Sequence, residues 1–148
     1  MEELIASVRV ALGNTVVMYY KTHTYHWNVE GIEFSQYHDF FQGIYEDVYS
    51  AVDPTAENLR KLGAYAPISI MELYSYKTVQ EDSVMPVLLV DMLTNLIAAN
   101  TETYSAFSKV FDLATEQKEQ GLANFAADRM NNHRKHGWML SSSLKKIG

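Results

Sequence analysis

The sequence predicts an all-α protein: a bundle of four long helices, with a short helix in one long connection. Two observations support this fold class. Only seven of the 148 residues are glycine and three are proline, and these mostly separate long stretches free of helix breakers. Within the stretches, apolar residues recur at alternating steps of three and four, which is the spacing of one helix face. The length fits one domain, so residues 1–148 are expected to share a single core.

The first predicted helix runs from about Glu2 to Val29 and ends near Gly31. The second follows Gly31 and continues to Gly63, but Pro54 falls inside it. Because proline has no backbone donor and its ring clashes with the preceding turn, a kink or a break is expected there.

The long connection lies between the second and third helices. Leu62–Pro67 is predicted to be a loop, and Ile68–Tyr76 could form one or two helical turns. The third helix is predicted to begin near Ser83, a suitable N-cap, with Pro86 in its first turn. It should end in the polar run at Gly121, and the fourth helix should cover about Leu122 to Lys145.

Composition excludes several classes of protein. The chain has 12 basic and 18 acidic residues and a formal charge of −6, which is unfavourable for binding nucleic acid. It has no cysteine, which excludes a disulfide scaffold, a thiolate zinc site and a cysteine nucleophile. The acidic start is broken by Arg9 and does not resemble a signal peptide, and the most apolar stretch, Val84–Leu93, is too short to span a bilayer. A cytoplasmic protein is expected.

Two histidines, His26 and His38, each lie on the apolar stripe of a predicted helix, on either side of one turn. A single buried histidine is usually satisfied by hydrogen bonds alone. Two of them twelve residues apart favour a metal site, because imidazole is a common ligand of iron and zinc and carboxylates supply the remaining oxygens.

Carboxylates are available at Asp53 and Glu57, whose spacing of four places them on one helix face. A structural explanation is equally open: Asp53 could cap a helix that starts at Pro54, with Glu57 favouring the helix N-terminus. His38 and Asp53 are fifteen residues apart, about 22 Å along one helix, and cannot bind the same ion within one chain. Either these residues share no site, or the site lies between two subunits whose second helices cross antiparallel about a two-fold axis.

Three stretches of the chain resemble the Dps family, the miniature cages of the ferritin-like proteins. They are KTHTYHWNVEGIEFSQYHDFFQGIY at residues 21–45, DPTAENLRKLGAYAP at residues 53–67 and DRMNNHRKHGWML at residues 128–140. The likeness covers nearly the whole chain, and HWNVEG followed by a histidine and then D-x-x-x-E is quite specific. The resemblance implies a ferritin-like four-helix subunit, with a short helix in the long connection, assembled into a dodecameric hollow shell.

The resemblance also implies a ferroxidase activity. The family oxidises Fe(II), preferentially with hydrogen peroxide, stores the ferric mineral and so protects against oxidative stress. For this chain either hydrogen peroxide or dioxygen stays open as the oxidant. Its site lies between two-fold-related subunits and holds up to two irons. Carried onto this chain, His26 and His38 come from one subunit, and Asp53 and Glu57 come from its partner, with Glu57 placed to bridge the irons.

The chain departs from the family pattern at Gln42, where the family has an aspartate one turn after the second histidine. The second iron position, served by His38, Gln42 and Glu57, should therefore be weaker, while the first keeps His26, Asp53 and Glu57. Further departures are Pro54 within the carboxylate motif and Asn58 in place of the usual arginine. Two alternatives stay open: a cage that binds zinc or manganese at the first position, and a structural shell whose metal site is vestigial.

Other side chains could support such chemistry. Trp27 lies beside His26, and Tyr45 and Tyr49 share a face with His38, so these aromatic residues are either electron donors or ordinary core residues. His133 and His136, three apart, could bind a metal but are interpreted as surface or interface residues. Glu46 and Asp47 are either nucleation sites for ferric mineral or solvated carboxylates.

DNA binding is expected to be weak or absent at physiological salt. Family members that bind DNA use lysine-rich tails, whereas nothing precedes the first predicted helix here, and the C-terminal end offers only Lys145 and Lys146.

Overall fold

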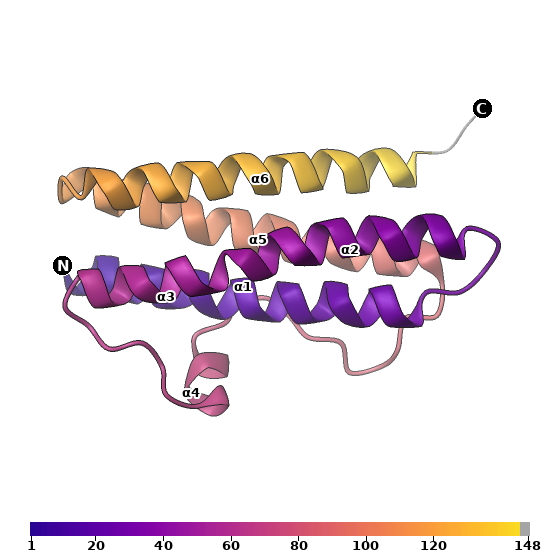
Figure 1. Ribbon diagram of the computed structural model, residues 1–148, viewed down its shortest axis with the longest axis horizontal. Coiled ribbons are helices and arrows are strands. Elements are labelled where there is room, and N and C mark those ends of the chain that lie inside the picture. Colours follow the sequence, from indigo (N-terminus) through magenta and orange to yellow (C-terminus); the bar gives the residue numbers. More distant parts are fainter. Residues whose placement is uncertain (146–148) are drawn as a thin grey trace.

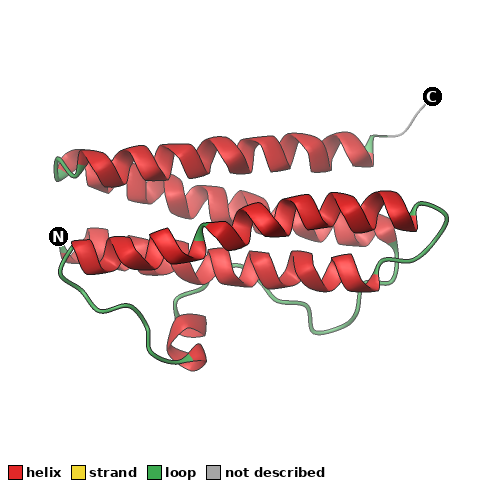
Figure 2. Cartoon of the chain, viewed as in Figure 1, coloured by secondary structure: helices red, strands yellow, loops and turns green. Residues whose placement is uncertain are grey.

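The computed structural model describes residues 1–145, which contain six helices and no strand (Figures 1 and 2). The helices are α1 (Glu2–Asn28), α2 (Phe34–Ser50), α3 (Val52–Lys61), α4 (Ile70–Ser75), α5 (Leu89–Glu116) and α6 (Gln120–Leu144). Lys146, counted above in the sparse basic end of the chain, lies outside the described residues.

Four long rods form the bundle, and α2 and α3 together make one of them (Figure 1). Helix α1 packs against α2, α3 and α5, and α5 packs against α6. Helix α4 sits beside the bundle in the long connection between α3 and α5. The predicted all-α four-helix bundle, with its short extra helix, is confirmed. Among the described residues, no helix is both long enough and apolar enough to cross a membrane.

The core has two clusters of buried apolar side chains, one toward each end of the bundle. The cluster at the α1–α2 turn contains Tyr25 and Phe41, and the cluster at the opposite end contains Leu4, Leu59 and Phe107. Each cluster contains side chains from three or more of the long helices, so both clusters hold these helices together. The α1–α2 turn, where the two histidines lie, is therefore built on a packed support.

The break between α2 and α3 occurs one turn before Pro54, as predicted. Pro54 has no N–H to donate to the carbonyl of Ser50, so the helix ladder is interrupted at Ala51. It resumes when the Thr55 N–H donates to the Ala51 carbonyl at 3.1 Å. Asp53 lies inside the first turn of α3, and the N-cap is Ala51, without a side-chain cap bond. The interpretation of Asp53 as a capping residue is therefore wrong.

The predicted start of the third long helix near Ser83 is also wrong, because α5 begins at Leu89. Pro86 disfavours helical backbone at the residue before it. In addition, the preceding segment is tied to α1, because the Tyr25 hydroxyl donates to the Asp82 carboxylate at 2.5 Å. This bond holds the segment before α5 against α1.

Candidate metal centre

His26 and His38 face each other across the α1–α2 turn. Their rings stack with centroids 3.7 Å apart and an interplanar angle of 17°. Nδ1 of His26 lies 2.6 Å from the His38 carbonyl, and Nδ1 of His38 lies 2.7 Å from the His26 carbonyl. His26 is buried and His38 half-buried. The two histidines thus fix each other's position through reciprocal side-chain-to-backbone bonds.

These bonds determine which ring nitrogen can bind a metal. A carbonyl oxygen only accepts hydrogen bonds, so each Nδ1 must carry the proton and donate. Nε2 of each neutral ring then keeps its lone pair. Metal-binding histidines usually donate their second ring nitrogen to a carbonyl or carboxylate in this way, which fixes the tautomer and the orientation of the ring. The pair is chemically fit to supply two nitrogen ligands.

The carboxylates predicted to complete the site lie elsewhere in the chain. Asp53 and Glu57 are on α3, beyond the break at Ala51, and both are exposed. Within residues 1–145, no group of three or more histidine, aspartate or glutamate side chains is arranged to hold a metal ion. Within one chain, the histidine pair on the α1–α2 turn is therefore separate from the two carboxylates on α3.

Gln42 lies one turn after His38 and is half-buried. Its side-chain amide nitrogen donates to Glu46 Oε1 at 2.8 Å. This bond leaves the amide carbonyl oxygen as the only part of the side chain able to bind a cation. Asp39, the adjacent carboxylate, is exposed.

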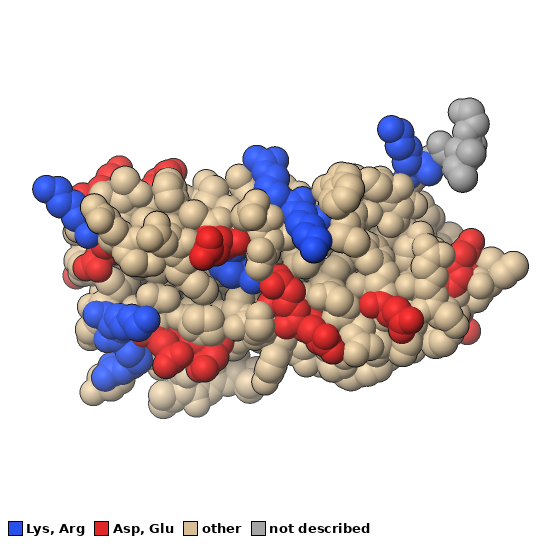
Figure 3. Space-filling model, turned by 45° about the horizontal axis from the view of Figure 1, so that its top comes forward, with Lys and Arg blue, Asp and Glu red and all other residues tan. Residues whose placement is uncertain are grey.

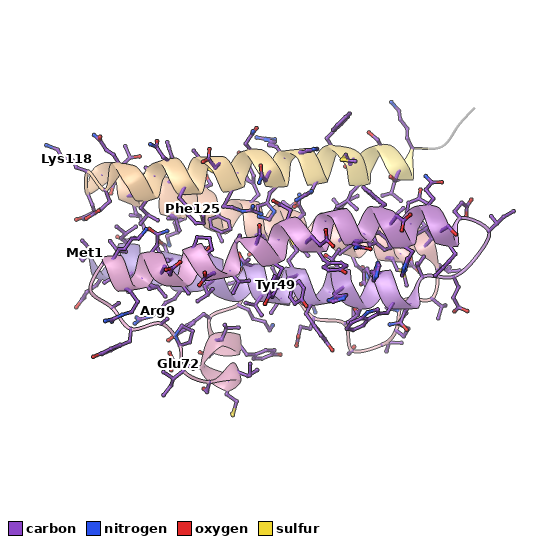
Figure 4. All side chains as sticks on the ribbon, in the orientation of Figure 1. Met1, Arg9, Tyr49, Glu72, Lys118 and Phe125 are labelled. Atoms are coloured by element: carbon purple, nitrogen blue, oxygen red, sulfur yellow. The ribbon has the colours of Figure 1, made fainter. Side chains whose placement is uncertain are left out.

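A cluster of aromatic rings adjoins the histidine pair. The Tyr45 ring lies 5.1 Å from the His26 ring and stacks on His23 at 3.9 Å and 13°. The Tyr19 hydroxyl lies 2.8 Å from Nδ1 of His23, and the Tyr19 ring is 4.9 Å from that of Tyr49, which projects from α2 (Figure 4).

Sequence reasoning assigned no role to His23, although its spacing of four from Tyr19 on one helix could have indicated the contact. Burial, and then the neighbouring His26, lower the pKa of the His23 imidazole. Burial, followed by the nearby Tyr49, Tyr45 and Tyr20, raises the pKa of the Tyr19 hydroxyl. Tyr19 therefore keeps its phenolic proton, and His23 is neutral and able to accept one.

Asp47, considered above as a mineral nucleation site or a solvated carboxylate, is instead held inside the subunit. Arg129 on α6 donates to both its oxygens at 3.1 and 2.9 Å, Asn132 donates at 3.0 Å, and His136 Nε2 lies 2.6 Å away. Burial alone would raise the pKa of Asp47, but hydrogen bonds from His136 and Arg129, with the Arg129 charge, outweigh burial and hold it well below its usual range. This network ties α2 to α6.

The pair His133 and His136 is buried, which corrects the expectation of a surface or interface role. His133 Nδ1 lies 2.9 Å from Asn100 Oδ1, and its Nε2 lies 3.2 Å from the Arg129 guanidinium. Burial, and then the charges of Arg129 and His136, lower the pKa of His133 to about 3. Both imidazoles are used in holding α5, α6 and α2 together.

The four-helix bundle, with a short helix in its long connection, is the fold of a ferritin-like protein, a class whose bundles carry histidine and carboxylate ligands on their helices. Comparison with known proteins agrees: the family model described as a ferritin-like domain matches residues 6–148. Antigen TpF1 of Treponema pallidum (strain Nichols) is 33% identical over 129 residues, which cover 87% of this chain and 73% of TpF1.

Among ferritin-like proteins, solved structures of Dps proteins are similar to this chain. Dps from Thermosynechococcus elongatus superposes with a TM-score of 0.94 at 25% identity, covering 99% of this chain and 92% of that one. The Dps protein from Vibrio cholerae O1, described as a member of the ferritin-like diiron-carboxylate superfamily, gives 0.91 at 26% identity, covering 97% and 90%. The chain belongs to the Dps family.

Proposed function

We propose that this protein is a ferroxidase that oxidises Fe(II), with hydrogen peroxide as the preferred oxidant, and stores the ferric product in a hollow dodecameric shell. The observation that carries the proposal is the pair of complementary half-sites. His26 and His38 present basic Nε2 atoms held by reciprocal Nδ1 bonds, and the carboxylates of Asp53 and Glu57 stand exposed on another helix. Neither half is a metal site alone.

A two-fold axis that brings the α2 helices of two subunits together in antiparallel orientation would complete the site. It would bring the histidine pair of one subunit to Asp53 and Glu57 of the partner subunit. Two ferrous ions then give up one electron each, and one peroxide with two protons becomes two waters. The Dps and ferritin-like families store iron and protect against oxidative damage, which supports this reading.

Gln42 sets the balance between the two iron positions. Its neutral amide oxygen compensates less of an iron's charge than a carboxylate would, so the position near His38 should hold iron more weakly than the position near His26. The same residue favours a second candidate function: a cage that holds zinc or manganese at the first position and turns over iron slowly.

The remaining features of the proposal concern partners and location. On the face shown in Figure 3, Lys and Arg are interspersed with Asp and Glu and form no continuous basic surface. Together with the net charge of −6, this supports weak or absent DNA binding at physiological salt. We place the protein in the cytoplasm, where peroxide and ferrous iron meet.

The test is iron oxidation followed by gel filtration. Purified protein is loaded anaerobically with Fe(II), mixed with peroxide or with dioxygen, and the ferric absorbance is followed. Glu57→Gln removes the bridging charge without changing the side-chain size, and Asp112→Asn is the matched control at an exposed carboxylate on α5. We expect rapid peroxide-dependent oxidation, with iron retained in a large assembly, in the parent and the control but not in Glu57→Gln. Oxidation no faster than the buffer blank in the parent would refute the proposal.

A further inference from the structure

Glu46 lies one turn beyond Gln42 on α2 and accepts a hydrogen bond from its side-chain amide, with 2.8 Å between Gln42 Nε2 and Glu46 Oε1. His38, Gln42 and Glu46 are spaced four residues apart, so they occupy successive turns of one face of α2. Glu46 is exposed, and among residues 1–145 no basic side chain forms an ion pair with it. Its negative charge is therefore not neutralised within the subunit.

The hydrogen bond determines how the Gln42 amide is turned. A carboxylate oxygen only accepts hydrogen bonds, so the part of the amide that faces Glu46 must be the NH2 group. The carbonyl oxygen is on the other branch of the same planar group and faces away from Glu46. His38 lies one turn from Gln42 in the direction opposite to Glu46. Without this bond the amide would be free to turn over and present N–H groups, which cannot bind a cation.

The bond also makes the amide oxygen a better ligand. Donation of an N–H to a charged acceptor polarises the amide and increases the negative charge on its carbonyl oxygen. Groups that hydrogen-bond to a metal ligand fix its orientation and raise its basicity, and their loss typically weakens metal binding roughly 10- to 100-fold. Gln42 and Glu46 together therefore offer a cation both an oxygen ligand and a compensating charge.

We propose that Glu46 is a positioning residue for the second iron position. It holds Gln42 with the carbonyl oxygen available to the metal and supplies, through that amide, the negative charge that glutamine itself lacks. Glu46 does not touch the metal. The inference rests on the proposed function, which places the second iron beside His38 and Gln42. The first position, at His26, does not depend on Glu46, because its other ligands are carboxylates with their own charge.

Two neighbouring carboxylates on α2 do not fit this role. Asp47 is bonded to α6 instead. Asp39 is exposed and directly follows His38, so it lies about 100° around the helix from that histidine. The Gln42 amide is bonded to Glu46 and not to Asp39. Asp39→Asn therefore removes the same charge close to the same histidine without touching the amide, which makes it the matched control.

The experiment measures metal binding in the absence of any oxidant. The assembled protein is titrated anaerobically with Fe(II) in a calorimeter, which resolves the first and the second metal bound per site. A parallel titration with Co(II) uses the visible absorption of the bound ion, which reports the ligands at each position. The variants are Glu46→Gln, which removes the charge at constant size, Asp39→Asn, Gln42→Asp, and Gln42→Asp combined with Glu46→Gln.

We expect Glu46→Gln to weaken the second metal about tenfold and to leave the affinity for the first within about twofold of the parent. Asp39→Asn should change neither affinity by more than about twofold. In the Gln42→Asp background, the aspartate has its own charge and no N–H to donate. Adding Glu46→Gln there should change the second affinity by less than about twofold. A merely structural role for Glu46 would depend neither on the side chain at position 42 nor on which metal is measured.

The outcomes separate this inference from the proposed function. If the parent binds two metals per site but Glu46→Gln binds the second as tightly, or weakens both equally, the inference is overturned and the ferroxidase proposal stands. The same holds if Asp39→Asn weakens the second metal as much as Glu46→Gln does, or if Glu46→Gln has its full effect in the Gln42→Asp background. A parent that binds one metal per site at saturation also overturns the inference. If the parent binds no Fe(II), the ferroxidase proposal fails and the role of Glu46 falls with it.

Discussion

The buried imidazole of His133 should make the protein lose stability in mild acid. Its side chain is fully buried, and its pKa is lowered from an ordinary 6.5 to about 3. Burial is the largest cause of this shift, and the contacts leave no free ring nitrogen for a second proton. Arg129, which only donates hydrogen bonds, occupies the lone pair of Nε2, while Nδ1 is 2.9 Å from Asn100 Oδ1. A second proton would have to displace the guanidinium.

Proton linkage gives the direction and the size of the change in unfolding free energy with pH. Below pH 6.5 the unfolded chain protonates this histidine and the folded protein does not, so stability falls as pH falls from about 6.5 toward 3. Between pH 7.5 and pH 5 the loss from this residue should be about 2 kcal/mol. Asp47 does not contribute in this range, because its lowered pKa matters only below the ordinary value of 3.8.

The assay is urea unfolding at pH 7.5 and pH 5, at one fixed protein concentration because any assembly of subunits would also stabilise the fold. His133→Gln is the comparison, since glutamine keeps a donor for Asn100 and does not titrate. The variant will be less stable overall, but its stability should depend on pH less than the parent's, by about 2 kcal/mol across this range. His23, whose pKa is also lowered, makes stability fall in the same direction, but it is present in both proteins and cancels in the comparison. An equal pH dependence in parent and variant would refute the reasoning.

Three further predictions follow from the contacts. Gln42→Asp should tighten the second Fe(II) bound per site by about tenfold in anaerobic calorimetry, because a charged oxygen replaces a neutral one, and unchanged binding would contradict this. Asp47→Asn should cost roughly 2–3 kcal/mol in urea unfolding, because it leaves the buried Arg129 without its counter-ion, and a neutral effect would show that the network is dispensable. Tyr25→Phe should lower the free energy of unfolding by roughly 1–2 kcal/mol and speed amide hydrogen exchange in the segment around Asp82. Unaltered exchange in that segment would contradict this prediction.

Much of the fold was predictable because it depends on local pattern. The three-and-four spacing of apolar residues located every long helix, and Pro54 located the break, since both effects act within a turn or two of the chain. The start of α5 at Leu89 was placed too early because the weight of Pro86 against a helix before it was underestimated, and because the bond between Tyr25 and Asp82, 57 residues apart, is not visible in the sequence.

The candidate site was also predictable only in the part that depends on local sequence. The sequence singled out His26 and His38, but their tautomer is visible only once each Nδ1 is seen against the other's carbonyl. Asp47 was considered for mineral nucleation because its partner Arg129, 82 residues away, belongs to a helix that local pattern cannot place beside it. The assignment of Asp53 and Glu57 to a shared site stays a prediction, because it concerns a second subunit.

The central claim is that each iron site takes its histidines from one subunit and its carboxylates from another, and mixed assemblies test it most directly. A variant lacking both His26 and His38 and a variant with Glu57→Gln are each expected to be inactive. When the two are unfolded together and reassembled in equal amounts, half the two-fold dimers should be mixed, and each mixed dimer should hold one intact site. The account predicts recovery of about a quarter of the parental rate of peroxide-dependent Fe(II) oxidation. No recovery in a fully mixed assembly would contradict a shared site. Each variant chain lacks either the histidines or the Glu57 carboxylate, so activity can return only at a site that two chains build together.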